Sequence, residues 1–171
     1  KIKEFLMKKL TLYAATVTAI FGAQVQAAPG DVQLVGFVSP VCEVTGLSTQ
    51  LMDFGNVSQI QNLSVSGLNM KCNDVDGATV TLTSAEGGLE SDDSEDYALT
   101  YDATFNPSGL APFTLNAPGG PGLNDVSVSN SYGGSGALAT GVAASIDIVT
   151  TETSPWAGGY SDTLTVNITS N

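Results

Sequence analysis

The sequence contains no histidine and no arginine, and its two cysteines do not form a paired metal-binding motif. Histidine is the usual general base for serine and cysteine nucleophiles, so its absence removes the commonest nucleophilic catalytic sites. No glycine loop of the phosphate-binding type is found, and the carboxylates Asp53, Asp102, Asp147 and Asp162 occur in ordinary strand or turn contexts. We therefore predict that the protein is not an enzyme and uses no cofactor and no metal.

Positive charge is scarce: seventeen acidic residues face five basic ones, and the formal net charge is −12. Four of the five lysines lie within the first nine residues, which leaves Lys71 as the one base of the remaining chain. A surface this acidic has almost nothing with which to neutralise phosphates. The composition excludes nucleic acids and anionic lipid surfaces as partners.

Long apolar runs are also rare, and the one that occurs lies near the N-terminus. It extends from Leu10 to Ala23, after Met7-Lys8-Lys9 and before the small residues Val25 and Ala27. A basic start, a short apolar stretch and small residues before a cleavage point are typical of a secretory signal peptide. We predict a signal peptide over 1–27, with 1–6 as a possible upstream artefact, export from the cytoplasm, and no membrane insertion.

The two cysteines, Cys42 and Cys72, are thirty residues apart. In an exported chain a single pair of cysteines is expected to oxidise to a disulfide. Two free buried thiols are the alternative.

The rest of the chain has the composition of an all-β protein. Strands rich in Val, Thr, Leu, Ile and Tyr are expected at 32–38, 41–44, 51–57, 63–72, 78–84, 97–105, 126–129, 142–149 and 160–168. Clusters of Gly, Pro, Asn, Asp and Ser separate them, and the Gly/Pro-rich stretches 107–122 and 130–141 are predicted loops. This spacing predicts a single antiparallel sandwich or barrel. The acidic run 90–96 is predicted to be a solvated hairpin tip, with a calcium loop as the alternative.

The last predicted strand raises the question of what covers its edge. Leu164, Val166 and Ile168 alternate with polar residues, so one face of this strand is expected to be buried. An uncovered apolar edge would aggregate. Three solutions exist: pairing within the chain, closure into a barrel, or addition of a strand from another molecule.

The segment 28–40 is a candidate for such an added strand. Val32, Leu34, Gly36 and Val38 fall on one side of it when it is extended, and Pro40 then interrupts the ladder. Val35 and Phe37 on the other side are also apolar, so the inserted face could be theirs. Pairing of this segment with another copy would give a head-to-tail filament. The other possibility is an ordinary first strand of a self-complete sandwich.

One motif near the C-terminus resembles a known family. Ala157-Gly158-Gly159-Tyr160-Ser161-Asp162-Thr163, followed by Leu-Thr-Val-Asn-Ile, is similar to the A-G-x-Y-x-D-T ending of spore coat protein U domains, which include subunits of archaic chaperone–usher pili. The motif residues are Ala157, Gly158, Tyr160, Asp162 and Thr163. An N-terminal strand, the stretch 51–55 and two cysteines follow the same order along the chain.

The resemblance implies an incomplete immunoglobulin-like β-sandwich completed by donor-strand exchange. It makes 28–40 the N-terminal donor strand and 41–171 the pilin domain. It assigns Val32, Leu34, Gly36 and Val38 to the donor face, and Leu164, Val166 and Ile168 to the acceptor groove. The implied partners are neighbouring copies of the same subunit, a periplasmic chaperone and an outer-membrane usher.

From the resemblance we expect a structural subunit of a bacterial surface pilus, located outside the cell, that mediates attachment and biofilm formation. A non-polymerising spore-coat-like or matrix sandwich is one alternative. A carbohydrate-binding module is the other, although Trp156 is the only tryptophan.

Overall fold

The structure, a computed structural model, describes residues 34–47, 52–93, 97–120, 125–154 and 156–171. The chain divides into two units, 1–38 and 39–171. The predicted signal peptide and Val32 lie outside the described residues. No helix in the described ranges has both the length and the apolar character needed to span a bilayer.

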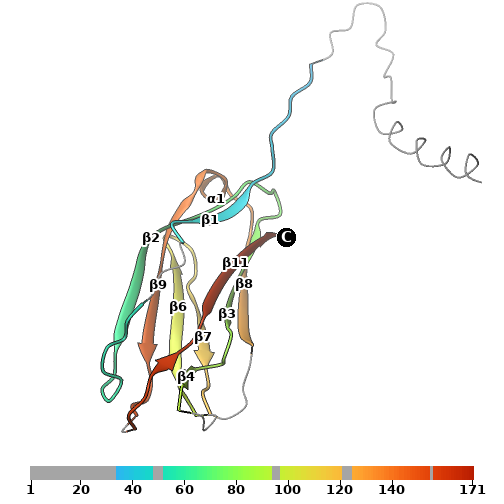
Figure 1. Ribbon diagram of the computed structural model, residues 1–171. Coiled ribbons are helices and arrows are strands. Elements are labelled where there is room, and N and C mark those ends of the chain that lie inside the picture. The colour runs from blue at the N-terminus through green and yellow to red at the C-terminus, as the bar shows by residue number, and fades with distance from the viewer. Residues whose placement is uncertain (1–33, 48–51, 94–96, 121–124, 155) are drawn as a thin grey trace, which may run out of the picture. The chain divides into compact units, whose positions relative to one another are not determined.

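Within the second unit the described residues form strands and one short helix (Figure 1). The elements are β1 (Cys42–Thr45), β2 (Asn62–Cys72), β3 (Ala78–Ser84), β4 (Leu89–Ser91), β5 (Ala98–Leu99), β6 (Tyr101–Pro107), β7 (Phe113–Ala117), β8 (Val126–Tyr132), α1 (Gly136–Thr140), β9 (Val142–Thr150), β10 (Tyr160–Ser161) and β11 (Leu164–Ser170). The all-β prediction is confirmed.

The strands pair antiparallel in three sheets. The largest has the order β1-β2-β9-β6-β7, the second the order β11-β3-β8, and a small sheet the order β10-β4-β5. Buried side chains from the two larger sheets form one hydrophobic cluster, in a sandwich-like arrangement. Its most enclosed members include Phe105, Met70, Leu82 and Ile146.

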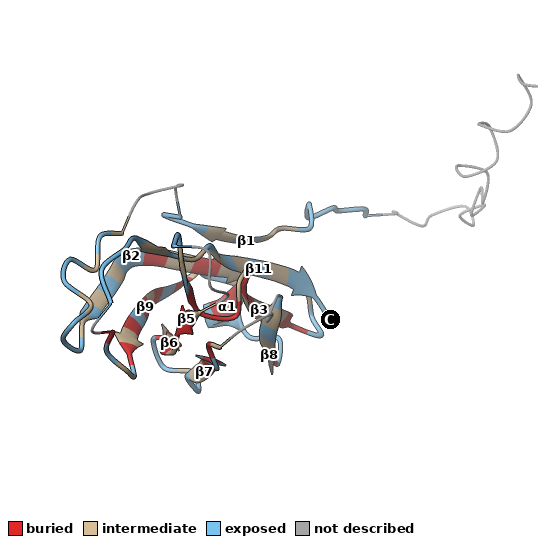
Figure 2. Ribbon diagram, turned by 60° about the horizontal axis from the view of Figure 1, so that its bottom comes forward, coloured by how far each residue is buried: buried red, intermediate tan, exposed pale blue. Residues whose placement is uncertain are grey.

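In the central strands, buried residues alternate strictly with more exposed ones. In β3, Ala78, Val80, Leu82 and Ser84 are buried, whereas the threonines between them point away from the core. β9 follows the same pattern, with every second residue buried along its whole length (Figure 2). Successive side chains of a strand point to opposite faces, so such a pattern fixes which face covers the core.

Several predicted strands differ from the observed ones. Residues 52–57 of the predicted strand 51–57 form no strand, and neither do residues 34–38 of the predicted strand 32–38. The predicted strand 97–105 is interrupted at Thr100, and the predicted strand 160–168 is interrupted at Asp162 and Thr163. At the second interruption Asp162 turns its side chain into the protein, as described below.

Two elements lie in stretches predicted to be loops. α1 falls within 130–141, where the Ser135 side chain accepts a hydrogen bond from the Leu138 amide and so caps the helix start. β7 falls within 107–122, and its Leu115 and Ala117 are buried. Short elements flanked by glycine and proline were missed because the turn residues dominate the local composition.

A candidate assembly groove beside the C-terminal strand

One edge of β11 has no paired strand among the described residues. β11 pairs along its full length with β3, from Leu164 opposite Ser84 to Ser170 opposite Ala78, and it ends its sheet on the other side. Leu164, Val166 and Ile168 point inward and pack against the hydrophobic cluster, but no residue of β11 is buried (Figure 2). The predicted alternation is therefore present, on a strand whose apolar face is covered only in part.

The neighbouring edge of the large sheet is also incomplete. β1 pairs with β2 only over residues 69–72, so β2 has no described partner on that side from Asn62 to Leu68. A bulge between Val65 and Leu68 shifts the register of β2 within this part. Gly67 lies in the bulge with φ +77°, a conformation that glycine adopts without strain. The sandwich therefore has two open strand edges among the described residues, one in each of its two larger sheets.

A groove with a volume of about 600 Å³ lies along these edges. Leu164 and Val166 line it from β11, and Val65, Ile146 and Ile148 line it from β2 and β9. Ile168 is not among the lining residues. β1 contacts β11, and the half-buried Val44 of β1 packs against the same core, so part of β11 is covered by β1.

The remaining wall of the groove comes from residues outside the predicted groove edge. Leu47, Met52 and Phe54 line it from the segment between β1 and β2, and Tyr101 and Leu89 complete it. These residues lie far from β11 in the sequence and carry no shared motif. The stretch 52–57 was predicted to be a strand, and its apolar residues were the available signal that it packs against the core.

Asp162, a residue of the family-like motif, joins three strands at the polar end of the groove. Its Oδ2 accepts hydrogen bonds from Ser84 Oγ and from Tyr101 Oη, the latter at 2.6 Å. Its Oδ1 accepts from the Glu86 amide at 3.0 Å and from the Thr163 amide at 2.6 Å. One carboxylate therefore satisfies two side-chain hydroxyls and two backbone donors.

The Tyr101 hydroxyl belongs to a side chain that is 2% exposed. Burial raises the pKa of Tyr101 well above its ordinary value, and the hydrogen bond to the Asp162 carboxylate raises this pKa further. Tyr101 therefore stays a neutral hydrogen-bond donor throughout the physiological range.

The other motif residues build the turn that leads into β11. Tyr160 pairs with Ser91 in the small sheet, and the Tyr160 and Ser154 hydroxyls are hydrogen-bonded at 2.7 Å. The Gly159 amide donates to Asp92 Oδ1 at 2.7 Å, and a side chain at this glycine would collide with the Asp92 carboxylate. Gly158 has φ +149°, and Ala157 is exposed. These contacts are structural and involve no reactive arrangement.

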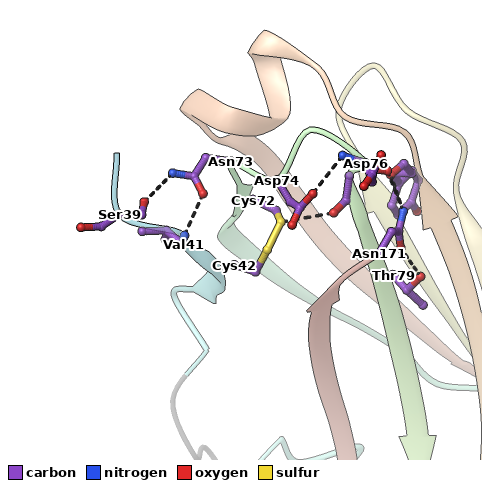
Figure 3. Close-up of a disulfide and its surroundings, with 11 residues drawn as sticks. Ser39, Val41, Cys42, Cys72, Asn73, Asp74, Asp76, Thr79 and Asn171 are labelled. Carbon is purple, nitrogen blue, oxygen red and sulfur yellow. Dashed lines mark hydrogen bonds between the residues drawn. A yellow bond between two sulfur atoms is a disulfide. The ribbon is translucent and has the colours of Figure 1, made fainter. Parts of the chain in front are cut away.

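The start of the second unit is fixed by a disulfide between Cys42 and Cys72, as predicted (Figure 3). The two cysteines are directly paired across β1 and β2. The Asn73 side chain binds the preceding residues: its Oδ1 accepts from the Val41 amide at 2.8 Å, and its Nδ2 donates to the Ser39 carbonyl at 2.7 Å. The chain is thus anchored from Ser39 onward.

The predicted donor residues lie in the first unit, where 34–38 are described. Leu34 is 89% exposed and Val38 79% exposed, and Gly36 lies between them. On the other side of the segment, Val35 and Phe37 are 88% and 86% exposed. Both faces of this apolar segment are open to solvent, so exposure does not choose between them.

The described residues contain no group of three or more histidine, cysteine or carboxylate side chains placed to hold a metal ion. In the acidic run 90–96, Glu90 and Ser91 belong to β4, which pairs with β5, and residues 94–96 lie outside the described ranges. The hairpin tip stays a prediction, with calcium binding as its alternative. No family model, no curated protein and no solved structure matches the chain.

Proposed function

We propose that the protein is a structural subunit of a bacterial surface pilus, assembled by donor-strand exchange and serving attachment and biofilm formation. In this proposal 39–171 is an incomplete immunoglobulin-like sandwich of the spore coat protein U type. The segment 32–38 of a neighbouring copy enters the groove and adds a strand beside β11. A periplasmic chaperone occupies the groove before assembly, and an outer-membrane usher catalyses the exchange.

The observation that carries the proposal is the apolar groove between two open strand edges. An isolated sandwich gains stability by closing such an opening, because apolar area left in water forfeits about 25 cal/mol per Å². Leu164 and Val166 remain half-buried beside a volume of about 600 Å³. A further strand fits this arrangement because β11 offers a row of backbone donors and acceptors and the groove takes alternate side chains.

The second support is the exposed apolar segment. Contiguous exposed apolar side chains usually mark an interaction site, and Leu34, Val35, Phe37 and Val38 are each at least 79% exposed. An extended stretch of this length supplies one strand. The same chain therefore contains a candidate donor and a candidate acceptor, which is the requirement for a heterologous contact that repeats into a filament.

The interaction free energies expected for an inserted strand are large enough for a stable contact between subunits. Burial of three aliphatic side chains contributes about 1.5–3 kcal/mol each. Ladder hydrogen bonds contribute about 0.5–1.5 kcal/mol apiece. Ordering of the donor and loss of rotational and translational freedom offset part of this sum.

Deletion of 28–38 from the exported chain tests the proposal. In cells that supply a chaperone and an usher, the full-length protein should give fibres that resist boiling in detergent and collapse to monomers only under harsh denaturation. The deletion variant should be exported and disulfide-bonded but should give no fibres. Fibres formed by the deletion variant would refute donor exchange, and a stable full-length monomer without a chaperone would favour the coat or matrix alternative.

A further inference from the structure

The outer face of the β11-β3-β8 sheet is free of charge. None of its three strands contains an acidic or basic residue. The outward positions are hydroxyl or amide side chains throughout, beginning with three threonines of β3 and three serines of β8: Thr79, Thr81, Thr83, Ser127, Ser129 and Ser131. β11 adds two threonines and an asparagine at its alternate outward positions.

These side chains form a regular array because the three strands are in register. Thr79 lies opposite Ser131 and Thr81 opposite Ser129, and in both pairs the two hydroxyl oxygens are 2.7 Å apart. The β11 residues continue the same rows on the other side of β3. Neighbouring strands are about 4.8 Å apart and alternate residues about 6.7 Å apart, so the polar groups repeat in two dimensions.

The absence of charge here contrasts with the rest of a strongly acidic chain. The outward positions of the large sheet include Asp102 and Asp147. Acidic residues also lie just beyond the ends of the uncharged strands, at Asp76 and Asp125. Two copies of a chain with net charge −12 repel each other over most of their surfaces. The uncharged face is a place where two copies can approach with little repulsion.

We propose that this face binds the same face of a second copy, and so joins neighbouring filaments side by side. A contact between identical surfaces must be self-complementary. Hydroxyl and amide groups meet this condition, because each is both a donor and an acceptor, whereas an ionised carboxylate only accepts. This inference rests on the proposed function, since it needs filaments to join.

A single such contact is weak. The face is polar and lacks the apolar core of a stable interface, so isolated copies do not pair through it. In a filament the face repeats at every subunit, and each contact after the first forms at a high effective concentration. Lateral association is therefore a property of filaments and not of monomers.

The test compares purified filaments by electron microscopy. Ser127→Asp with Ser131→Asp places two charges on the face, both at exposed positions of β8 and outside the groove. Ser127→Asn with Ser131→Asn gives the same side-chain shape without charge. Thr114→Asp with Ala143→Asp is the control for added charge, because both residues point outward from the large sheet. Filament length and resistance to boiling report polymerisation separately.

Wild-type, asparagine and control filaments should lie side by side. The aspartate variant should form filaments of normal length, but the fraction of filament length in lateral contact should fall by at least roughly tenfold. Lateral contact of the aspartate filaments should return near 1 M salt, where charges are screened beyond about 3 Å. Wild-type filaments that never associate, or aspartate filaments that associate equally well, overturn this inference alone. Equal loss in the control also overturns it, by assigning the effect to net charge. Failure of the wild type to polymerise overturns the proposed function and this inference together.

Discussion

Tyr101 Oη donates a 2.6 Å hydrogen bond to Asp162 Oδ2. This bond joins β6 of the large sheet to the turn that leads into β11 of the other sheet. Asp162 also accepts from Ser84 at the end of β3. The position of β11, and with it one wall of the groove, is thus set by a carboxylate as well as by the ladder to β3. Asp162 belongs to the motif on which the family resemblance depends, and the contact gives this residue a physical role.

Asp162→Ala should destabilise the protein by about 3 kcal/mol. The substitution leaves the buried hydroxyls of Tyr101 and Ser84 without their acceptor, and each unsatisfied buried group costs about 1–3 kcal/mol. Urea unfolding of the subunit with its groove occupied, compared in the same state for wild type and variant, measures the effect. The matched control is Asp102→Ala, whose carboxylate accepts from the exposed Asn116 side chain and should cost less than about 1 kcal/mol. Equal losses in the two variants would show that Asp162 has no special role.

The raised pKa of Tyr101 predicts a loss of stability at alkaline pH. The unfolded tyrosine titrates near its ordinary value, about 10, whereas the folded one keeps its proton to higher pH because it is buried and bonded to Asp162. The stabilisation is therefore complete below pH 10 and declines above it, by up to about 1.4 kcal/mol per pH unit.

Tyr101→Phe isolates this contribution from those of Tyr97 and Tyr132, whose pKa values are also raised by burial. The variant should be less stable than the wild type near pH 8, because one hydrogen bond is lost. The difference in free energy of unfolding between wild type and variant should become smaller between pH 10 and pH 11, because only the wild type loses the Tyr101 contribution there. Free energies of unfolding that stay parallel over this range would contradict the prediction.

Gly77→Ala should destabilise the protein by about 2 kcal/mol or more. Gly77 has φ +97°, and a Cβ atom there would lie 1.9 Å from the Tyr132 carbonyl oxygen, where β3 begins opposite β8. Gly133 is a matched control, because a Cβ atom there meets no other atom within 4 Å. Thermal unfolding should show a clear decrease in melting temperature for Gly77→Ala and little change in melting temperature for Gly133→Ala. A similar decrease for both would remove the steric argument.

Single aspartates in the proposed donor segment test which of its two faces enters the groove. Leu34→Asp should abolish polymerisation if the face of Val32, Leu34, Gly36 and Val38 is inserted, because it places a charge in an apolar site. Val35→Asp lies on the opposite side and should be tolerated. Detergent-resistant ladders on gels provide the readout. Loss of polymer in the Val35 variant alone would assign insertion to the face of Val35 and Phe37, and normal polymers from both would exclude this segment as the donor.

Much of the fold was predictable because its strands alternate strictly. β3 and β9 lie centrally in their sheets, and their buried faces follow directly from every second residue. β4, β7 and α1 were not predicted, since elements of three to five residues contain too few periods to outweigh neighbouring glycines and prolines. The disulfide was predicted from the number of cysteines and from the expected export of the chain.

The groove was predictable on one side only. Leu164 and Val166 carry a local signal, the alternation of β11, and both line the groove. Phe54, Tyr101 and Ile146 meet them through tertiary packing, which no local pattern encodes. Ile168 shares the alternation of its neighbours but is not among the residues that line the groove, and β11 is also contacted by β1. Periodicity identifies a buried face, and the length of the adjacent strand decides how much of that face stays open.

The most direct measurement is a high-resolution structure of the assembled fibre. In the fibre, residues 32–38 of one copy should lie as a strand in the groove of the next, hydrogen-bonded along the free edge of β11. Residues 32–38 folded back beside β11 of their own molecule, or a groove left empty within the fibre, would contradict this prediction.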